Sequence, residues 1–181
     1  YIVHDTITKI FLAGDIMIGL SDMGNEINNW TVNGMWNETT EEFYSSATSY
    51  TDSPFEDYEA DQITEMKLDA PIDLTDAEDA FLNFYAKWDI EANYDLAQIM
   101  GSVDGNTYMP LCGKYTTPGT NNQDLDEPVY EGTQTDWVME EINLEDLHNH
   151  MDKELDLKTI SVDDNNIKNI KLINISGGNT I

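Results

Sequence analysis

Acidic side chains flank a corner near the middle of the chain. Glu91 and Asp95 border an interruption between two apolar runs, while Asp52 and Asp57 belong to an earlier turn that also holds serine and proline. Calcium prefers oxygen ligands such as carboxylates, usually about six to eight of them. Carboxylates that approach one another repel, and a divalent cation offsets that repulsion. These four residues therefore predict a structural calcium site, with the alternative that they cap turns and face water.

Two histidines offer a second set of potential metal ligands. His148 and His150 lie in a polar segment with Asp152 and Glu154. A His-x-His pair ligates zinc when both side chains project from one face of a strand, but the sequence places no third ligand beside this pair. The histidine pair is therefore a weaker candidate than the acidic corner, and its role stays open.

Motifs of catalysis are missing from the sequence. It contains no His-Glu-x-x-His, no Gly-x-Ser-x-Gly, no phosphate-binding glycine loop and no paired Cys/His nucleophile system. Cys112 is the only cysteine, which excludes an internal disulfide and a thiolate zinc site. Carboxylate pairs are too frequent in so acidic a chain to indicate a catalytic pair. We therefore expect no enzymatic activity from this chain and no catalytic cofactor.

Aromatic residues offer the remaining binding chemistry. Rings on an exposed sheet face can stack against sugars, whereas most tryptophans of a β-sandwich pack in the core or at its edge. Spacing alone does not separate the two arrangements, so carbohydrate binding stays an alternative function. The aromatic candidates are Trp30, Trp36, Trp88, Trp137, Tyr44, Tyr50, Tyr58, Tyr94 and Tyr130.

The charge of the chain restricts its partners. Among 181 residues, 36 are acidic and eight are basic, for a formal net charge of −28. Such a surface repels phosphate groups, so we expect no nucleic-acid partner and no anionic membrane partner. Divalent cations and cationic peptides remain as partners, and solubility alone also explains the charge. The sequence has no apolar run of the roughly 18 residues that would span a membrane.

The segment before the acidic corner alternates like a β-strand. From residue 81 to residue 88 every even-numbered residue is apolar, which predicts that Leu82, Phe84, Ala86 and Trp88 face a core. A second apolar run covers residues 96–100 and ends at Gly101. Strand, acidic corner and strand in succession are typical of a β-sheet protein.

Further alternating runs lie between turn residues, and no sustained helical periodicity is present. The expected strands are residues 30–36 as a hairpin about Asn33-Gly34, and residues 63–68, 108–115, 137–144, 155–162 and 167–175. The pattern predicts an all-β fold, an antiparallel β-sandwich of jelly-roll type.

We expect one sandwich domain over residues 29–175. Residues 1–28 would form an entry segment or linker with an edge strand, and residues 176–181 a frayed end. The chain starts at Tyr1, with neither an initiator methionine nor a signal peptide, which favours a mature form or a piece of a longer polypeptide.

Several stretches together resemble a known module. The most specific are Phe84-Tyr85-Ala86-Lys87-Trp88-Asp89-Ile90-Glu91 and Pro110-Leu111-Cys112-Gly113-Lys114-Tyr115. The others are residues 5–11, 29–31, 51–54, 71–75, 94–95, 135–138 and 140–142. In this order they resemble the non-catalytic, MAM-like jelly-roll module that follows the catalytic domain in secreted bacterial zinc carboxypeptidases and in immune-inhibitor-A-type metalloproteases.

The resemblance implies a secreted or cell-surface accessory domain. Such a domain would act in cis with a parent catalytic domain and stabilise it, position it, or engage a peptide, protein or glycan surface. In the family, the glutamate of the Trp-Asp-Ile-Glu motif and aspartates of the last strand are implicated in calcium binding. Glu91 matches that glutamate, whereas Lys168 and Asn169 stand where the family has an acidic, aromatic segment.

Overall fold

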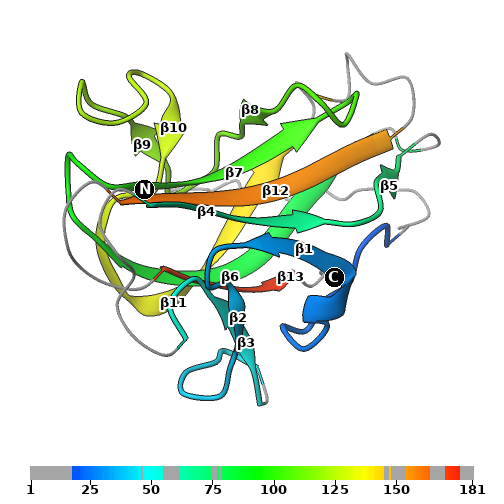
Figure 1. Cartoon of the computed structure of the whole chain (residues 1–181). Coiled ribbons are helices and arrows are strands. Elements are labelled where there is room, and N and C mark those ends of the chain that lie inside the picture. Colours follow the sequence, from blue (N-terminus) through cyan, green and yellow to red (C-terminus); the bar gives the residue numbers. More distant parts are fainter. Residues whose placement is uncertain are drawn as a thin grey trace, which may run out of the picture.

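The computed structural model describes residues 18–45, 47–54, 62–74, 77, 79–144, 147, 154–163 and 170–175. Strands predominate in these ranges, and a short 3-10 helix, η1 (Ile27–Asn29), precedes the first of them. Figure 1 shows the strands in two facing layers.

Each layer is an antiparallel sheet. Sheet A contains, in spatial order, β11 (Gly132–Asn143), β6 (Phe81–Ile90), β13 (Ile170–Ile175), β3 (Ser49–Thr51) and β2 (Asn37–Thr39). Sheet B contains β1 (Trp30–Asn33), β4 (Gln62–Leu68), β12 (Glu154–Asp163), β7 (Leu96–Ser102) and β8 (Met109–Pro110), and β5 (Ile72–Asp73) pairs with the start of β12. The short strands β9 (Thr117–Pro118) and β10 (Pro128–Val129) pair with each other.

The strand pairs are nested along the sequence. β3 pairs with β13, β4 with β12, β6 with β11, and β7 with β8. Successive pairs alternate between sheet A and sheet B, so the chain resembles one long hairpin rolled into two layers. This is the topology of a jelly roll, and the predicted all-β antiparallel sandwich is confirmed.

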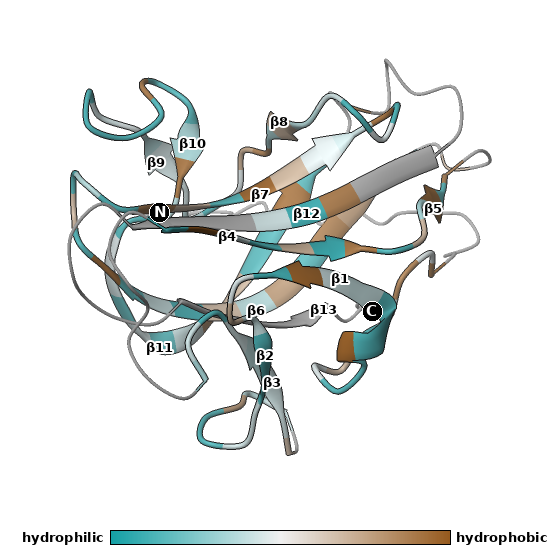
Figure 2. Cartoon of the chain, viewed as in Figure 1, coloured by the Kyte–Doolittle hydropathy of each residue, from teal (hydrophilic) through white to brown (hydrophobic). Residues whose placement is uncertain are grey.

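The interior strand β6 shows why the sandwich forms. Its even-numbered residues are buried along the whole strand, and its odd-numbered residues are partly or fully exposed. Leu82, Phe84, Ala86 and Trp88 face the core, as predicted. Figure 2 shows the same alternation of hydrophobic and hydrophilic residues along β4 and β6, which is expected of strands with one face toward a core.

The predicted hairpin at residues 30–36 is wrong. Gly34 does turn the chain, with φ of 86°, but β1 pairs with β4 in sheet B, whereas β2 pairs with β3 in sheet A. The reason is Trp36, whose side chain is buried and whose indole Nε1 donates to Oγ1 of Thr64 at 3.1 Å. Anchoring this ring in the core carries the chain across from one sheet to the other.

The remaining expected strands form with altered bounds. Strands at 63–68, 96–100, 137–144 and 155–162 are confirmed as parts of β4, β7, β11 and β12, and β13 covers the second half of the expected 167–175 strand. The expected strand at 108–115 is limited to β8, because the chain turns away after Leu111. The expected domain bounds at residues 28 and 175 stay predictions, since residues 1–17 and 176–181 lie outside the described ranges.

Candidate functional site

The acidic corner lies between β6 and β7, where the chain crosses from sheet A to sheet B. Asn93 adopts a left-handed backbone conformation with φ of 69°, and the amide of Asp95 donates to the carbonyl of Glu91 at 3.1 Å. The carboxylate of Glu131 accepts the Asn93 amide at 2.6 Å and the Gln123 side-chain amide at 3.0 Å. Glu131 therefore anchors the corner to the segment that carries β9 and β10.

The predicted calcium ligands occupy different environments. Glu91 is exposed, whereas Asp95 and Asp52 are fully buried, and Oδ1 of Asp52 accepts the Ser53 hydroxyl at 3.0 Å. Thr51 pairs with Lys171, which pairs with Lys87, so Asp52 lies at the end of sheet A from which the corner departs.

The positions of Glu91, Asp95 and Asp52 alone do not define a metal site. In the ranges that the structure describes, no three histidine, cysteine, aspartate or glutamate side chains are grouped to hold a metal ion. Asp57, His148 and His150 lie outside those ranges, so the calcium site and the role of the histidine pair stay predictions.

A buried carboxylate that the sequence analysis missed organises another part of the fold. Glu140 is fully buried on β11 and accepts the amides of Lys114 at 2.6 Å and Tyr115 at 3.0 Å. It also accepts the Tyr130 hydroxyl at 3.0 Å and the amide of Glu141 at 2.8 Å. The sequence contains a signal for this burial, because Glu140 alternates with the apolar Val138 and Ile142 and therefore faces the same side of the strand.

The surroundings of Glu140 are tightly packed. A Cβ atom on Gly113 would lie 2.9 Å from both the Glu140 carboxyl carbon and the Tyr130 hydroxyl, so only glycine fits there without movement. Burial raises the pKa of Tyr130 well above its usual value, and the adjacent Glu140 carboxylate raises it further. The Tyr130 hydroxyl therefore stays protonated as a donor, and this cluster holds a turn rather than a reactive group.

Most of the aromatic candidates belong to the core. Trp30, Trp36, Trp88, Tyr50 and Tyr130 are buried, so they cannot form a surface platform. Their packing gives them a structural role: Trp88, for example, meets Tyr130 edge to face at a centroid distance of 5.2 Å. Tyr58 lies outside the described residues.

The other aromatic candidates lie at or near the surface. Tyr44 and Tyr94 are exposed, whereas Trp137 is partly buried and packs in part against the core. Tyr44 stacks on Tyr85, with ring centroids 3.4 Å apart and planes inclined by 12°. A hydrogen bond with Tyr44 raises the pKa of Tyr85. Sequence analysis did not select Tyr85, because its partner is distant in the sequence.

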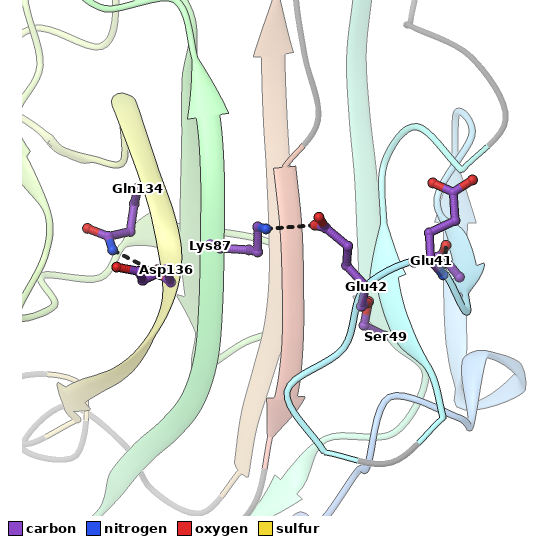
Figure 3. A network of polar contacts seen from close by, with 7 residues as sticks. Glu41, Glu42, Ser49, Lys87, Gln134 and Asp136 are labelled. Carbon is purple, nitrogen blue, oxygen red and sulfur yellow. Dashed lines mark hydrogen bonds and ion pairs between the residues drawn. The ribbon is translucent and has the colours of Figure 1, made fainter.

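Lys87 extends this surface on the same face of β6 as Tyr85. Its Nζ forms an ion pair with Glu42 at 2.7 Å and lies 6.0 Å from the centroid of the Trp137 ring. Figure 3 shows Lys87 reaching across β13 toward Glu42, with Gln134 and Asp136 of β11 on its other side. We call the set Tyr44, Tyr85, Lys87 and Trp137 the aromatic strip of sheet A.

Comparisons with known proteins do not assign the chain to a family. The sequence matches no family model, and no similar sequence is found among curated proteins. Within the described residues, no helix has the length and hydrophobicity to cross a membrane. The class of the protein is therefore defined by its sheet topology, which is that of an all-β jelly-roll sandwich.

Proposed function

We propose that this chain is a non-catalytic accessory β-sandwich domain of a secreted metallopeptidase-like protein. The observation that supports it most is the contact of Glu140 with the turn at Lys114 and Tyr115. The two stretches that meet there, residues 110–115 and 140–142, are both among those that resemble the accessory module. The stretch that contains Trp88 forms the interior strand β6.

In this proposal the domain acts outside the cell, in cis with a parent catalytic domain. It stabilises or positions that domain, or it engages a peptide, protein or glycan surface. Calcium bound through Glu91 stabilises it. The net charge of −28 keeps nucleic acids and anionic membranes away from it.

The test of the class is the reading frame that encodes this chain, which we expect to specify a zinc carboxypeptidase catalytic domain upstream. A second test is a peptidase assay on the purified chain with and without added zinc, for which we expect no turnover. A rate that survives purification and disappears on His148→Ala and His150→Ala substitution would contradict the proposal and identify the pair as a site.

A second candidate function is that of a jelly-roll carbohydrate-binding module. The observation that favours it is the aromatic strip, in which ring faces and hydrogen-bonding side chains lie together on the outer face of one sheet. A glycan array with the isolated chain tests this function directly, and retention of a defined glycan is the expected result.

A further inference from the structure

We propose that an uncharged polysaccharide binds along the aromatic strip of sheet A, with Tyr44 and Trp137 as its stacking platforms. This inference rests on the second of the proposed functions and adds to it the face, the residues and the class of ligand.

The strip is assembled from separate parts of the chain. Tyr85 and Lys87 project from the same face of β6, about 7 Å apart along the strand. Tyr44 comes from the β2–β3 loop, which is tied down where the Ser49 hydroxyl donates to the carbonyl of Glu42 at 2.6 Å. The stack with Tyr85 and the ion pair with Lys87 hold the same loop on the sheet. Rings fixed in this way lose little conformational entropy when a ligand binds.

A β-bulge brings the second platform to the strip. Gln134 pairs with Trp88 and Val138 pairs with Ala86, so the three residues 135–137 of β11 lie opposite Lys87 alone. The side-chain amide of Gln134 donates to the carbonyl of Asp136 at 2.9 Å within this bulge (Figure 3). Bulges redirect side chains and are frequent beside functional sites. Here the bulge places Trp137 next to Lys87 although the regular strand would offer a single residue at that point.

The chemistry of the strip suits sugars. One face of a pyranose ring presents C–H groups that pack against an aromatic ring, while its hydroxyl groups need hydrogen-bond partners at the edge. Tyr44 is 48% exposed even though one of its faces covers Tyr85, so its other face is open to a ligand. Lys87 lies beside the Trp137 ring and pairs with Glu42, so an ammonium donor and a carboxylate acceptor are present on this face of the sheet.

The charge of the strip selects the class of polysaccharide. Lys87 is the one cation among the four residues that define the strip, and its ammonium group is paired with the Glu42 carboxylate. The net charge of −28 repels a uronic acid or sulfated polymer at long range. A neutral polymer of hexoses or pentoses pays no such cost, and it is the ligand that this surface fits.

Affinity electrophoresis tests the inference, with the folded chain run through gels that contain a mixed-linkage glucan, a xylan, a glucomannan or the anionic polygalacturonate. We expect at least one neutral polymer to retard the wild type, and Tyr44→Ala and Trp137→Ala each to weaken that binding about tenfold. The matched control is Tyr94→Ala, because Tyr94 is also 48% exposed but lies at the corner between β6 and β7. Thermal melts identify any variant that fails to fold. If Trp137→Ala proves to be unfolded, the result for Tyr44→Ala decides the test, because that substitution removes an exposed ring.

The outcomes separate the two proposals. A wild-type chain retarded by none of the four polymers would overturn the carbohydrate-binding function and the inference together. Retardation that Tyr44→Ala and Trp137→Ala leave unchanged, or that Tyr94→Ala weakens equally, would overturn the strip while leaving the function in place. Stronger retardation by polygalacturonate would overturn the class of ligand.

Discussion

The hydroxyl of Tyr130 donates a hydrogen bond to Oε2 of Glu140 at 3.0 Å, and both side chains are buried. Tyr130 follows β10, and Glu140 lies on β11. Through the same carboxylate, Glu140 holds the amides of Lys114 and Tyr115. A charged group in the core is stable here because each of its two oxygens accepts two hydrogen bonds.

We predict that Glu140→Gln destabilises the fold by about 2–5 kcal/mol in urea unfolding. A glutamine keeps one acceptor oxygen but turns an amide donor toward donors of the turn, so at least one buried donor loses its partner at a cost of about 1–3 kcal/mol. The charge-assisted character of the other bonds is lost as well.

The neighbouring Glu141→Gln is the control, because that side chain is exposed on the same strand. It should change stability by less than about 0.5 kcal/mol. If both variants unfold at the same urea concentration as the wild type, the Glu140 cluster contributes nothing to the fold.

A second prediction compares the two faces of β6. Phe84 is 3% exposed and Phe81 is 45% exposed, on opposite faces of one strand. Phe84→Ala should cost about 3–5 kcal/mol in chemical denaturation, because it leaves a cavity between the sheets. Phe81→Ala removes the same atoms from a half-solvated site and should cost far less. Equal losses for the two substitutions would mean that β6 does not present its even face to the core.

The contrast between β6 and Trp36 shows how far the sequence predicts the fold. The alternation of β6 is a local property, so burial of Leu82, Phe84, Ala86 and Trp88 follows from residue types alone. Which strand another strand pairs with is not determined by the local sequence. Trp36 turns away from β1 because Thr64 and the core accept its ring, and no pattern within residues 30–36 contains that information.

The candidate sites differ in the same way. The acidic corner was visible because its residues are close in sequence, whereas the Tyr44–Tyr85 stack joins residues 41 positions apart. Glu140 was overlooked because a carboxylate in so acidic a chain carries little information until its inward parity is considered. Buried Trp30, Trp88 and Tyr50 could not be separated from exposed Tyr44 by composition, since exposure depends on the packing of both sheets.

A third prediction concerns pH and the turn after β7. Oδ1 of Asp104 accepts the amides of Asn106 at 2.8 Å and Thr107 at 2.7 Å and the Ser102 hydroxyl at 3.0 Å. The hydrogen bonds from Thr107, Asn106 and Ser102 lower the pKa of Asp104 from 3.8 to about 2. Because the folded-state pKa is depressed, the stability from this carboxylate is complete above about pH 4 and is lost as the pH falls toward 2.

Asp104→Asn measures this contribution, since it keeps an acceptor oxygen but cannot titrate. The difference in melting temperature between wild type and Asp104→Asn should be constant from pH 7 to about pH 5 and should shrink toward pH 2. Asp136→Asn, which removes one exposed negative charge elsewhere, corrects for the change in net charge. A carboxyl titration of Asp104 by NMR with its midpoint near 4 would contradict the prediction.

The last prediction concerns calcium and Glu91. Glu91 is exposed at the corner, and no group of three potential ligands is present in the described part of the chain. Backbone carbonyl oxygens, or a carboxylate from outside the described residues such as Asp57, which the sequence nominates, would complete a calcium site at the corner. Calcium that binds only the folded state at a hundred times its dissociation constant adds about 2.7 kcal/mol of stability.

Thermal melts with calcium and with chelator, at fixed ionic strength, decide between bound calcium and general screening. A bound ion raises the melting temperature of the wild type, and Glu91→Gln removes most of that rise because it takes away a charged ligand. Glu41→Gln removes one exposed carboxylate on the β2–β3 loop and should keep the full rise. Equal rises in all three proteins would show that calcium only neutralises the net charge of −28, and Glu91 would then be an ordinary residue of the corner.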